Sequence, residues 1–171
     1  MKFYGWICLL IGALVVMMTA APSAVCFGQA TQHDGQHEKE IYSVSADAHA
    51  EIKEALRKAA ADNKRVIVVF GANWCFDCHA LDKDFHRPEA AAILDANYEV
   101  VHVDTGRGEK NQDLMAKYQV PIKRGIPGLA VLDSDGKLIY SQKNGEFENA
   151  RSLTPEAVVA FLNQWKPRQR S

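Results

Sequence analysis

Between residues 45 and 167 the chain alternates between apolar positions at helical spacing and short runs of β-branched residues, which are typical of strands. The helical spacing predicts helices over residues 47–62, 74–85, 90–96, 111–118 and 155–165. The apolar runs predict strands over residues 65–70, 98–104, 129–132 and 137–141. Pro88 interrupts the second helix, and the segment 90–96 completes it.

Two details predict how these strands are arranged. Residues 65–70 (RVIVVF) have almost no polar interruption, as expected of a central strand that is covered on both faces. Residues 133–136 (DSDG) lie between the last two strands, and Asp-Gly in this position is a strong hairpin signal. The order of elements therefore predicts an α/β fold with a central mixed β-sheet, helices on both of its faces, and a C-terminal β-hairpin and helix.

The N-terminal part of the chain lacks this pattern. Lys2 precedes an apolar or small run over residues 7–21, which is the layout of a secretory signal peptide, and the small residues Gly28 and Ala30 predict cleavage after Ala30. An uncleaved membrane anchor is the alternative, because the run is close to the minimum length for crossing a bilayer. Residues 31–44 are polar and aperiodic. We therefore predict an exported, periplasmic or otherwise extracytoplasmic protein with a signal peptide (1–30), a flexible polar leader (31–44), one domain (45–167) and a tail (168–171).

Charge and cysteine content narrow the class of protein. Twenty Lys and Arg residues against 21 Asp and Glu residues leave a formal net charge of -1, so the chain has no basic field for a phosphate backbone, and we expect no nucleic-acid partner. Removal of residues 1–30 would also remove Cys8 and Cys26. Cys75 and Cys78 are then the cysteines on which function can depend.

The candidate chemistry lies in the Cys75-Phe76-Asp77-Cys78 segment. Two residues between cysteines at a helix start bring both sulfurs within bonding reach. Cys75 lies at the helix N-terminus, where unpaired N–H groups and the helix dipole stabilise a thiolate, so its sulfur is expected to be the exposed nucleophile. Cys78, one turn deeper, would attack the resulting mixed disulfide and release the reduced partner. The pattern predicts a redox-active disulfide.

Three functions other than redox exchange are alternatives for the same cysteines. A zinc site would need two further ligands, and His79, His86 and His102 lack ligand spacing, so we expect no metal. Cys75-x-x-Cys78-His79 also matches the motif for covalent c-type haem attachment, but a haem needs a wide apolar pocket and usually a second axial ligand. A non-catalytic binding module is the third alternative, against which the intact cysteine pair argues. We expect no cofactor.

The strand RVIVVF that leads into GANWC-x-x-C, the later Ile126-Pro127 pair, and the closing hairpin and helix resemble the thioredoxin family over residues 48–166. Within this family, Asn-Trp-Cys-x-x-Cys-His and the secretory signal are most similar to exported bacterial thioredoxin-like proteins and to the periplasmic C-terminal domain of membrane thiol-disulfide interchange proteins. The resemblance implies a thioredoxin fold and a thiol-disulfide oxidoreductase, with Cys75 as the nucleophile and Cys78 as the resolving thiol.

The resemblance also assigns supporting residues. It implies a cis peptide bond between Ile126 and Pro127 opposite the disulfide, with the Ile126 backbone available to an extended substrate, and it implies that Trp74 shields the sulfurs. One position departs from the family, since Val69 stands where thioredoxins usually carry a buried Asp that accepts the proton of the resolving thiol. Water or a nearby carboxylate is expected to replace it, or turnover is slower.

The residues between the cysteines, Phe76 and Asp77, indicate the direction of electron flow. Asp77 places a negative charge near both sulfurs, which opposes the thiolate and favours the disulfide form. His79 is expected to be a solvated or packed neutral ring that does not offset this charge. We therefore predict a reductant of disulfides or cysteines in exported protein substrates. Because such a protein has no access to cytosolic reductases, we expect a membrane thiol-disulfide protein as its electron donor.

Overall fold

The computed structural model describes residues 40–121 and 124–168. The predicted signal peptide (1–30), most of the predicted leader and the end of the tail lie outside the described residues. The elements in chain order are α1 (Ala48–Asp62), β1 (Arg65–Gly71), α2 (Phe76–Phe85), α3 (Pro88–Asn97), β2 (Tyr98–Asp104), α4 (Gln112–Lys117), β3 (Gly128–Leu132), β4 (Leu138–Ser141), the short 3₁₀ helix η2 (Ala150–Ser152) and α5 (Pro155–Trp165).

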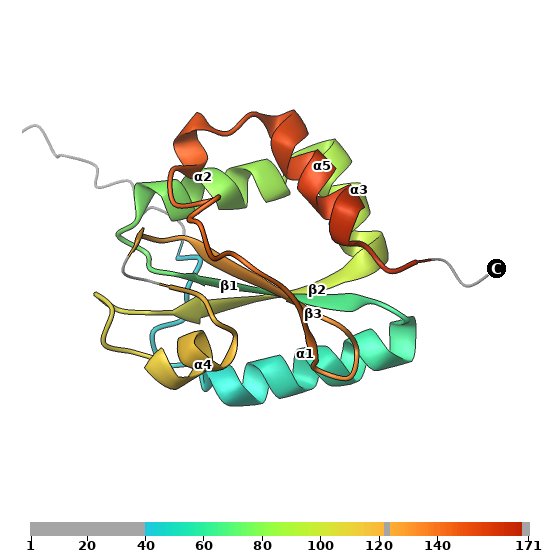
Figure 1. Cartoon of the computed structure of the whole chain (residues 1–171), viewed down its shortest axis with the longest axis horizontal. Coiled ribbons are helices and arrows are strands. Elements are labelled where there is room, and N and C mark those ends of the chain that lie inside the picture. Colours follow the sequence, from blue (N-terminus) through green and yellow to red (C-terminus); the bar gives the residue numbers. More distant parts are fainter. Residues whose placement is uncertain (1–39, 122–123, 169–171) are drawn as a thin grey trace, which may run out of the picture. The chain divides into compact units, whose positions relative to one another are not determined.

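The four strands form one mixed sheet in the order β2-β1-β3-β4. The strand β1 pairs in parallel with β2 and antiparallel with β3, and β3 pairs antiparallel with β4. Figure 1 shows α2, α3 and α5 on one face of this sheet and α1 with α4 on the other. The predicted fold class, a mixed sheet flanked by helices on both faces, is confirmed.

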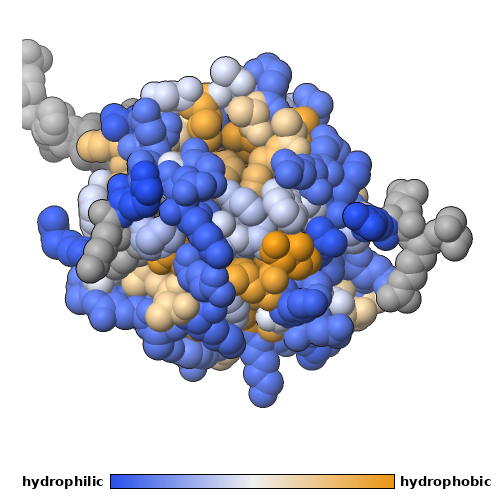
Figure 2. All heavy atoms as spheres, in the orientation of Figure 1, coloured by the Kyte–Doolittle hydropathy of each residue, from blue (hydrophilic) through white to orange (hydrophobic). Residues whose placement is uncertain are grey.

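The central strand β1 contributes to a separate hydrophobic core on each face of the sheet, because successive side chains of a strand point in opposite directions. Ile67 and Val69 pack in the core under α2, α3 and α5. Val66, Val68 and Phe70 pack in the core over α1 and α4. The hydrophilic outer faces of the helices cover much of the surface seen in Figure 2, with apolar side chains visible between them.

Local capping explains where two of the helices begin. Asp47 accepts hydrogen bonds from the backbone N–H groups of His49 and Ala50, at 3.0 and 3.1 Å, and so starts α1. Thr154 accepts from the N–H of Ala157 at 3.3 Å and precedes a proline at the first position of α5. Of the described helices, none is long and apolar enough to cross a membrane.

The structure corrects the sequence-based elements at three places. The helix predicted from residue 74 begins at Phe76, because Cys75 has extended backbone angles and acts as its N-cap. Pro88 does not resume the helix α2 but starts a separate helix, since its fixed φ suits a first helical turn. The helix η2 was not predicted, and its three residues are too few to show a period.

Candidate functional site

Cys75 and Cys78 form a disulfide at the start of α2, with their Cα atoms 5.2 Å apart. The chain leaves the buried strand β1 at Gly71, turns over the four residues 72–75, and enters α2 at Phe76. As the N-cap residue, Cys75 has its Sγ 3.1 Å from the backbone N–H of Cys78, which donates to the sulfur. This donor and the N-terminus of the helix dipole both stabilise negative charge on Cys75.

Both cysteines are buried in this disulfide form, and their neighbours are exposed. Cys75 is 5% exposed and Cys78 is 1% exposed. Trp74 and Phe76 are 52% and 65% exposed. The expectation of an exposed Cys75 sulfur is therefore wrong for the oxidised protein, because this sulfur packs against the backbone at Ile126. Trp74, Phe76 and Ile126 are thus the residues that flank Cys75 in sequence or in space.

The predicted cis peptide bond between Ile126 and Pro127 is present. The carbonyl oxygen of Ile126 lies 3.4 Å from the Sγ of Cys75, so the loop and the disulfide are in direct contact. The amide of Gln142, which is 2% exposed, donates to the carbonyl of Pro127 at 3.2 Å. Sequence reasoning missed Gln142, because a single polar residue after a half-buried strand carries no signal of its partner.

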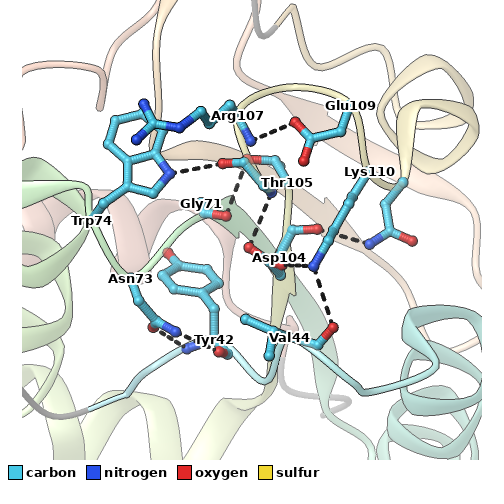
Figure 3. Close-up of polar contacts among 12 residues, drawn as sticks. Tyr42, Val44, Gly71, Asn73, Trp74, Asp104, Thr105, Arg107, Glu109 and Lys110 are labelled. Atoms are coloured by element: carbon cyan, nitrogen blue, oxygen red, sulfur yellow. Dashed lines mark hydrogen bonds and ion pairs between the residues drawn. The ribbon is translucent and has the colours of Figure 1, made fainter.

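Trp74 lies against the loop of residues 105–110 (Figure 3). Its indole N–H donates to the carbonyl of Gly106 at 2.8 Å, and the guanidinium of Arg107 lies 5.5 Å from the centre of its ring. The start of the loop is fixed by Thr105, whose backbone N–H and hydroxyl both donate to the carbonyl of Gly71, at 2.8 and 3.1 Å. Trp74 is thus positioned by polar contacts on one side of Cys75, a role that sequence reasoning did not assign to this loop.

Asp77 is paired with Arg151 of η2. Its carboxylate accepts from the backbone N–H of Arg151 at 3.0 Å and from the guanidinium at 3.1 and 3.2 Å. Burial alone would raise the pKa of Asp77, but the hydrogen bonds and the charge of Arg151 outweigh it and lower that pKa. Asp77 is therefore ionised, but its charge is matched by Arg151. The sequence-based argument that Asp77 alone opposes a thiolate is weakened accordingly.

His79 is held by the turn that precedes the disulfide. Its Nε2 lies 2.7 Å from the carbonyl oxygen of Asn73 and donates to it. Attachment of a c-type haem would need thioether bonds from both sulfurs, and here the two sulfurs are bonded to each other and packed in the core. Within residues 40–121 and 124–168, no group of three or more His, Cys, Asp or Glu side chains could hold a metal ion.

The last residues of the predicted leader are packed against this turn. Asn73 accepts at Oδ1 from the backbone N–H groups of Ile41 and Tyr42, at 3.0 and 2.9 Å, and donates from Nδ2 to the carbonyl of Tyr42 at 2.8 Å. Tyr42 is 1% exposed and belongs to the same core as Cys78 and Val69. Residues 31–44 are therefore not a detached leader along their whole length. One tyrosine in a polar stretch gave no periodic signal.

A mixed sheet of this topology, with a Cys-x-x-Cys disulfide at the start of α2 and a cis-proline beside it, defines a thioredoxin-fold disulfide oxidoreductase. A family model described as thioredoxin-like matches residues 47–134. The chain belongs to this thioredoxin-like family, and it is a thiol-disulfide oxidoreductase.

Three known proteins that are similar to this chain differ in their sequence identity to it. The thiol:disulfide interchange protein DsbD 2 of Pseudomonas aeruginosa is 30% identical over 120 residues, which are 68% of this chain but only 18% of that protein. A crystal structure of a disulphide isomerase from Xylella fastidiosa Temecula1 is 38% identical, with a TM-score of 0.70, over 74% of this chain and 96% of that one. A thioredoxin from Thermus thermophilus, 23% identical with a TM-score of 0.50 over 66% of this chain and 81% of that one, shares the fold.

Proposed function

We propose that the protein is exported and reduces disulfide bonds of other exported proteins, with Cys75 as the attacking thiol and Cys78 as the resolving thiol. The observation that carries the proposal is the disulfide between these residues at the N-terminus of α2, in contact with the backbone of Ile126. In the reduced protein, the Cys75 thiolate would attack a substrate disulfide, form a mixed disulfide and release one substrate thiolate. Cys78 would then attack the sulfur of Cys75 and release the second substrate thiolate.

The surroundings of Cys75 support a role for its neighbours in holding the substrate. Trp74 and Phe76 expose large apolar surfaces on either side of Cys75 in sequence. The residue before the cis-proline, Ile126, has its carbonyl beside the sulfur at 3.4 Å. We assign these residues, together with Pro127 and Asp77, to the support and binding of an extended substrate segment.

The environment of the Cys75 sulfur supports the reducing direction. The helix N-terminus and the N–H of Cys78 stabilise a Cys75 thiolate, but burial and the carbonyl oxygen of Ile126, 3.4 Å from the same sulfur, oppose this stabilisation. A strongly oxidising member of this class needs a very stable thiolate. Burial and the Ile126 carbonyl, and not the charge of Asp77, are therefore the main support for the reducing direction, because Arg151 compensates the charge of Asp77.

An exported reductant requires electrons from the membrane. The similarity to a thiol:disulfide interchange protein supports a membrane thiol-disulfide protein as the electron donor, although the chain spans only 18% of that relative. We place the protein in the periplasm or another extracytoplasmic compartment, delivered by residues 1–30 as a cleaved signal peptide or retained by them as an anchor. The domain assigned to residues 45–167 would then face the same compartment as its substrates.

Disulfide isomerisation is the second candidate function. It is favoured by the relative from Xylella fastidiosa, which is named a disulphide isomerase and is 38% identical to this chain. An isomerase and a reductase use the same first attack by Cys75. They differ in whether the mixed disulfide is resolved by Cys78 or by another thiol of the substrate.

The reduction potential of the Cys75–Cys78 disulfide tests the proposed direction of electron transfer, from this protein to its substrates. The protein is equilibrated with reduced and oxidised glutathione, and the fraction of the Cys75–Cys78 disulfide is measured by trapping free thiols. A reduction potential near that of thioredoxin is expected of a reductant. A potential as oxidising as the glutathione couple would contradict the reducing assignment, and efficient reactivation of scrambled ribonuclease in that case would establish the isomerase.

A further inference from the structure

The resolving thiol, Cys78, lies in an apolar core, where it must lose a proton before it can attack. Cys78 is 1% exposed and packs in the core that includes Val69 and Leu81. Burial in such surroundings raises the pKa of a thiol. A polar group that faces the sulfur and stabilises its negative charge would therefore accelerate the resolving step.

The hydroxyl of Tyr42 and this sulfur both lie beside Gly71. Gly71 has no side chain, and a methyl group there would collide with the hydroxyl of Tyr42 and, at 2.8 Å, with the Sγ of Cys78. The hydroxyl and the sulfur therefore border the same small space beside the end of β1. Figure 3 shows the ring of Tyr42 directed from the N-terminal segment toward Gly71, above the side chain of Asn73.

The hydroxyl of Tyr42 has no hydrogen-bond partner among the described residues, although it is fully buried. A buried hydroxyl without a partner loses its hydration and gains no hydrogen bond in return, so such groups are uncommon in folded proteins. In the disulfide form the Cys78 sulfur is a poor acceptor, whereas a thiolate at this place is a strong one. The unpaired donor is thus explained if its partner exists only after reduction.

We propose that Tyr42 is a positioning residue for the resolving thiol, whose hydroxyl donates a hydrogen bond to the sulfur of Cys78 when that sulfur is ionised. The inference rests on the proposed roles of Cys75 and Cys78. In the resolving step the Cys78 thiol loses its proton, its thiolate forms the Cys75–Cys78 bond, the bond from Cys75 to the substrate breaks, and the departing substrate sulfur takes up a proton. The hydroxyl stabilises the intermediate thiolate and is itself unchanged.

The groups around Tyr42 keep it a donor and hold it in place. The ionisable groups that face it are Cys78 and Asp82 on α2, and His102 and Asp104 on β2. Burial first, and then the charges of Asp82 and Asp104, raise the pKa of Tyr42, so the hydroxyl stays protonated. Its ring contacts the ring of His102 edge-on, with centroids 5.3 Å apart. Asn73 fixes its backbone through two hydrogen bonds and the backbone of the preceding Ile41 through a third.

The variant Tyr42→Phe tests this role, because it removes the hydroxyl and keeps the ring. All proteins carry Cys8→Ser and Cys26→Ser, so that two thiols react, and each is reduced and mixed with an aromatic disulfide that releases a coloured thiolate. The first release reports the attack by Cys75, and the second reports the attack by Cys78. We expect the second phase to be about threefold to tenfold slower in Tyr42→Phe, with its pH midpoint higher by about one unit, and the first phase to be unchanged.

The matched control is Tyr118→Phe, which removes a buried tyrosine hydroxyl from the core on the opposite face of the sheet. Both phases should keep the parent's rates and pH midpoints in this variant. Since the Tyr42 hydroxyl is unpaired in the disulfide form, oxidised Tyr42→Phe should unfold at a temperature equal to or above that of the parent. An unchanged second phase in Tyr42→Phe, or an oxidised variant that melts clearly below the parent, would overturn the inference. Absence of both phases in the parent would instead overturn the proposed function.

Discussion

The two sulfurs of the disulfide face regions of opposite character. The rim around Cys75, formed by Trp74, Phe76 and Ile126, combines exposed aromatic surface with a backbone carbonyl. The core behind Cys78 contains buried apolar residues and the buried, unpaired hydroxyl of Tyr42. A sulfur that attacks other proteins needs access and groups that align a partner. A sulfur that attacks its neighbour needs proximity and a way to become charged.

This difference explains why the two regions are held in different ways. Trp74 in the rim is positioned by one hydrogen bond and by a guanidinium at its ring, and its side chain is half exposed. The core behind Cys78 is fixed by packing around Gly71, where no extra atom fits. Substitutions in the rim should therefore alter the reaction with partners, whereas those in the core should alter stability or the resolving step.

Removal of each sulfur should produce the largest and most distinct effects. Cys75→Ser should lower disulfide reduction by at least about a thousandfold, because the attacking atom is lost. Cys78→Ser should retain the attack and accumulate a mixed disulfide between Cys75 and the substrate, since the resolving thiol is absent. Mass spectrometry of the trapped species distinguishes the two. Accumulation of mixed disulfide on Cys78 in Cys75→Ser, but not on Cys75 in Cys78→Ser, would reverse the assigned roles.

A methyl group at Gly71 should destabilise the core behind Cys78. Gly71→Ala would place its Cβ 2.8 Å from the Cys78 sulfur and against the hydroxyl end of Tyr42, so we expect a loss of about 3 kcal/mol in the free energy of unfolding. Denaturant titration measures this loss. The double variant Gly71→Ala with Tyr42→Phe should recover part of it, because the hydroxyl oxygen, one of the three colliding atoms, is gone, whereas the Cζ atom of the ring and the Cys78 sulfur remain. A fully additive cycle would show that the hydroxyl does not border the space beside Gly71.

The salt bridge between Asp77 and Arg151 should tune the reactivity of the rim. Arg151→Gln leaves the Asp77 charge uncompensated near the sulfurs, so we expect attack by Cys75 to be about threefold slower at neutral pH. Because the pKa of Asp77 is lowered in the folded protein, the ion pair stabilises the fold above the ordinary Asp pKa, and this contribution is lost as pH falls through the lowered value. The side chain of Arg151 is 61% exposed, so the contribution is about 0.5 kcal/mol.

The exposed pair of Arg57 and Glu54 on α1 supplies the control for this experiment. Arg57→Gln removes a guanidinium from a surface ion pair of the other face and should leave the rate of the Cys75 attack unchanged. Denaturant titrations at neutral and acidic pH give the stability difference for each variant. A rate unaffected by Arg151→Gln would show that Asp77 and its partner lie outside the electrostatic environment that controls Cys75.

The periodicity of the sequence predicted the fold, because the fold depends on which faces of the helices and strands are buried, and periodicity records those faces. The β-branched run of β1 and the Asp-Gly turn before β4 determined the sheet, and both are where they were expected. The Cys-x-x-Cys spacing and the Ile126-Pro127 pair likewise identified the disulfide and the loop that contacts it. The first two features and the cysteine spacing can be recognised from neighbouring residues. The position of the Ile126-Pro127 pair relative to the cysteines was predicted from the resemblance to the thioredoxin family.

The partners of these residues could not be predicted, because they come from distant parts of the chain. Arg151 is 74 positions from Asp77, and the contact of Asn73 with Tyr42 joins the predicted leader to the turn before α2. Neither interaction leaves a period or a motif in the sequence. The burial of Cys75 was missed for a related reason, because a helix N-terminus predicts a stable charge and not how closely a distant loop packs on it.

The smallest effect is expected at Trp74, where the rim contacts the loop of residues 105–110. Trp74→Phe keeps an aromatic ring but loses the 2.8 Å hydrogen bond to Gly106 and weakens the contact with Arg107. The ring would then be less well oriented toward a partner, so KM for a folded protein disulfide should rise about twofold to threefold, with kcat retained. A small aromatic disulfide reaches Cys75 without needing this surface and should react at the parent's rate. Trp165→Phe, on α5 beside Tyr140, is the control and should alter neither reaction. An equal loss toward both substrates in Trp74→Phe would show that Trp74 acts on the sulfur itself, and the distinction between rim and core would then fail at this residue.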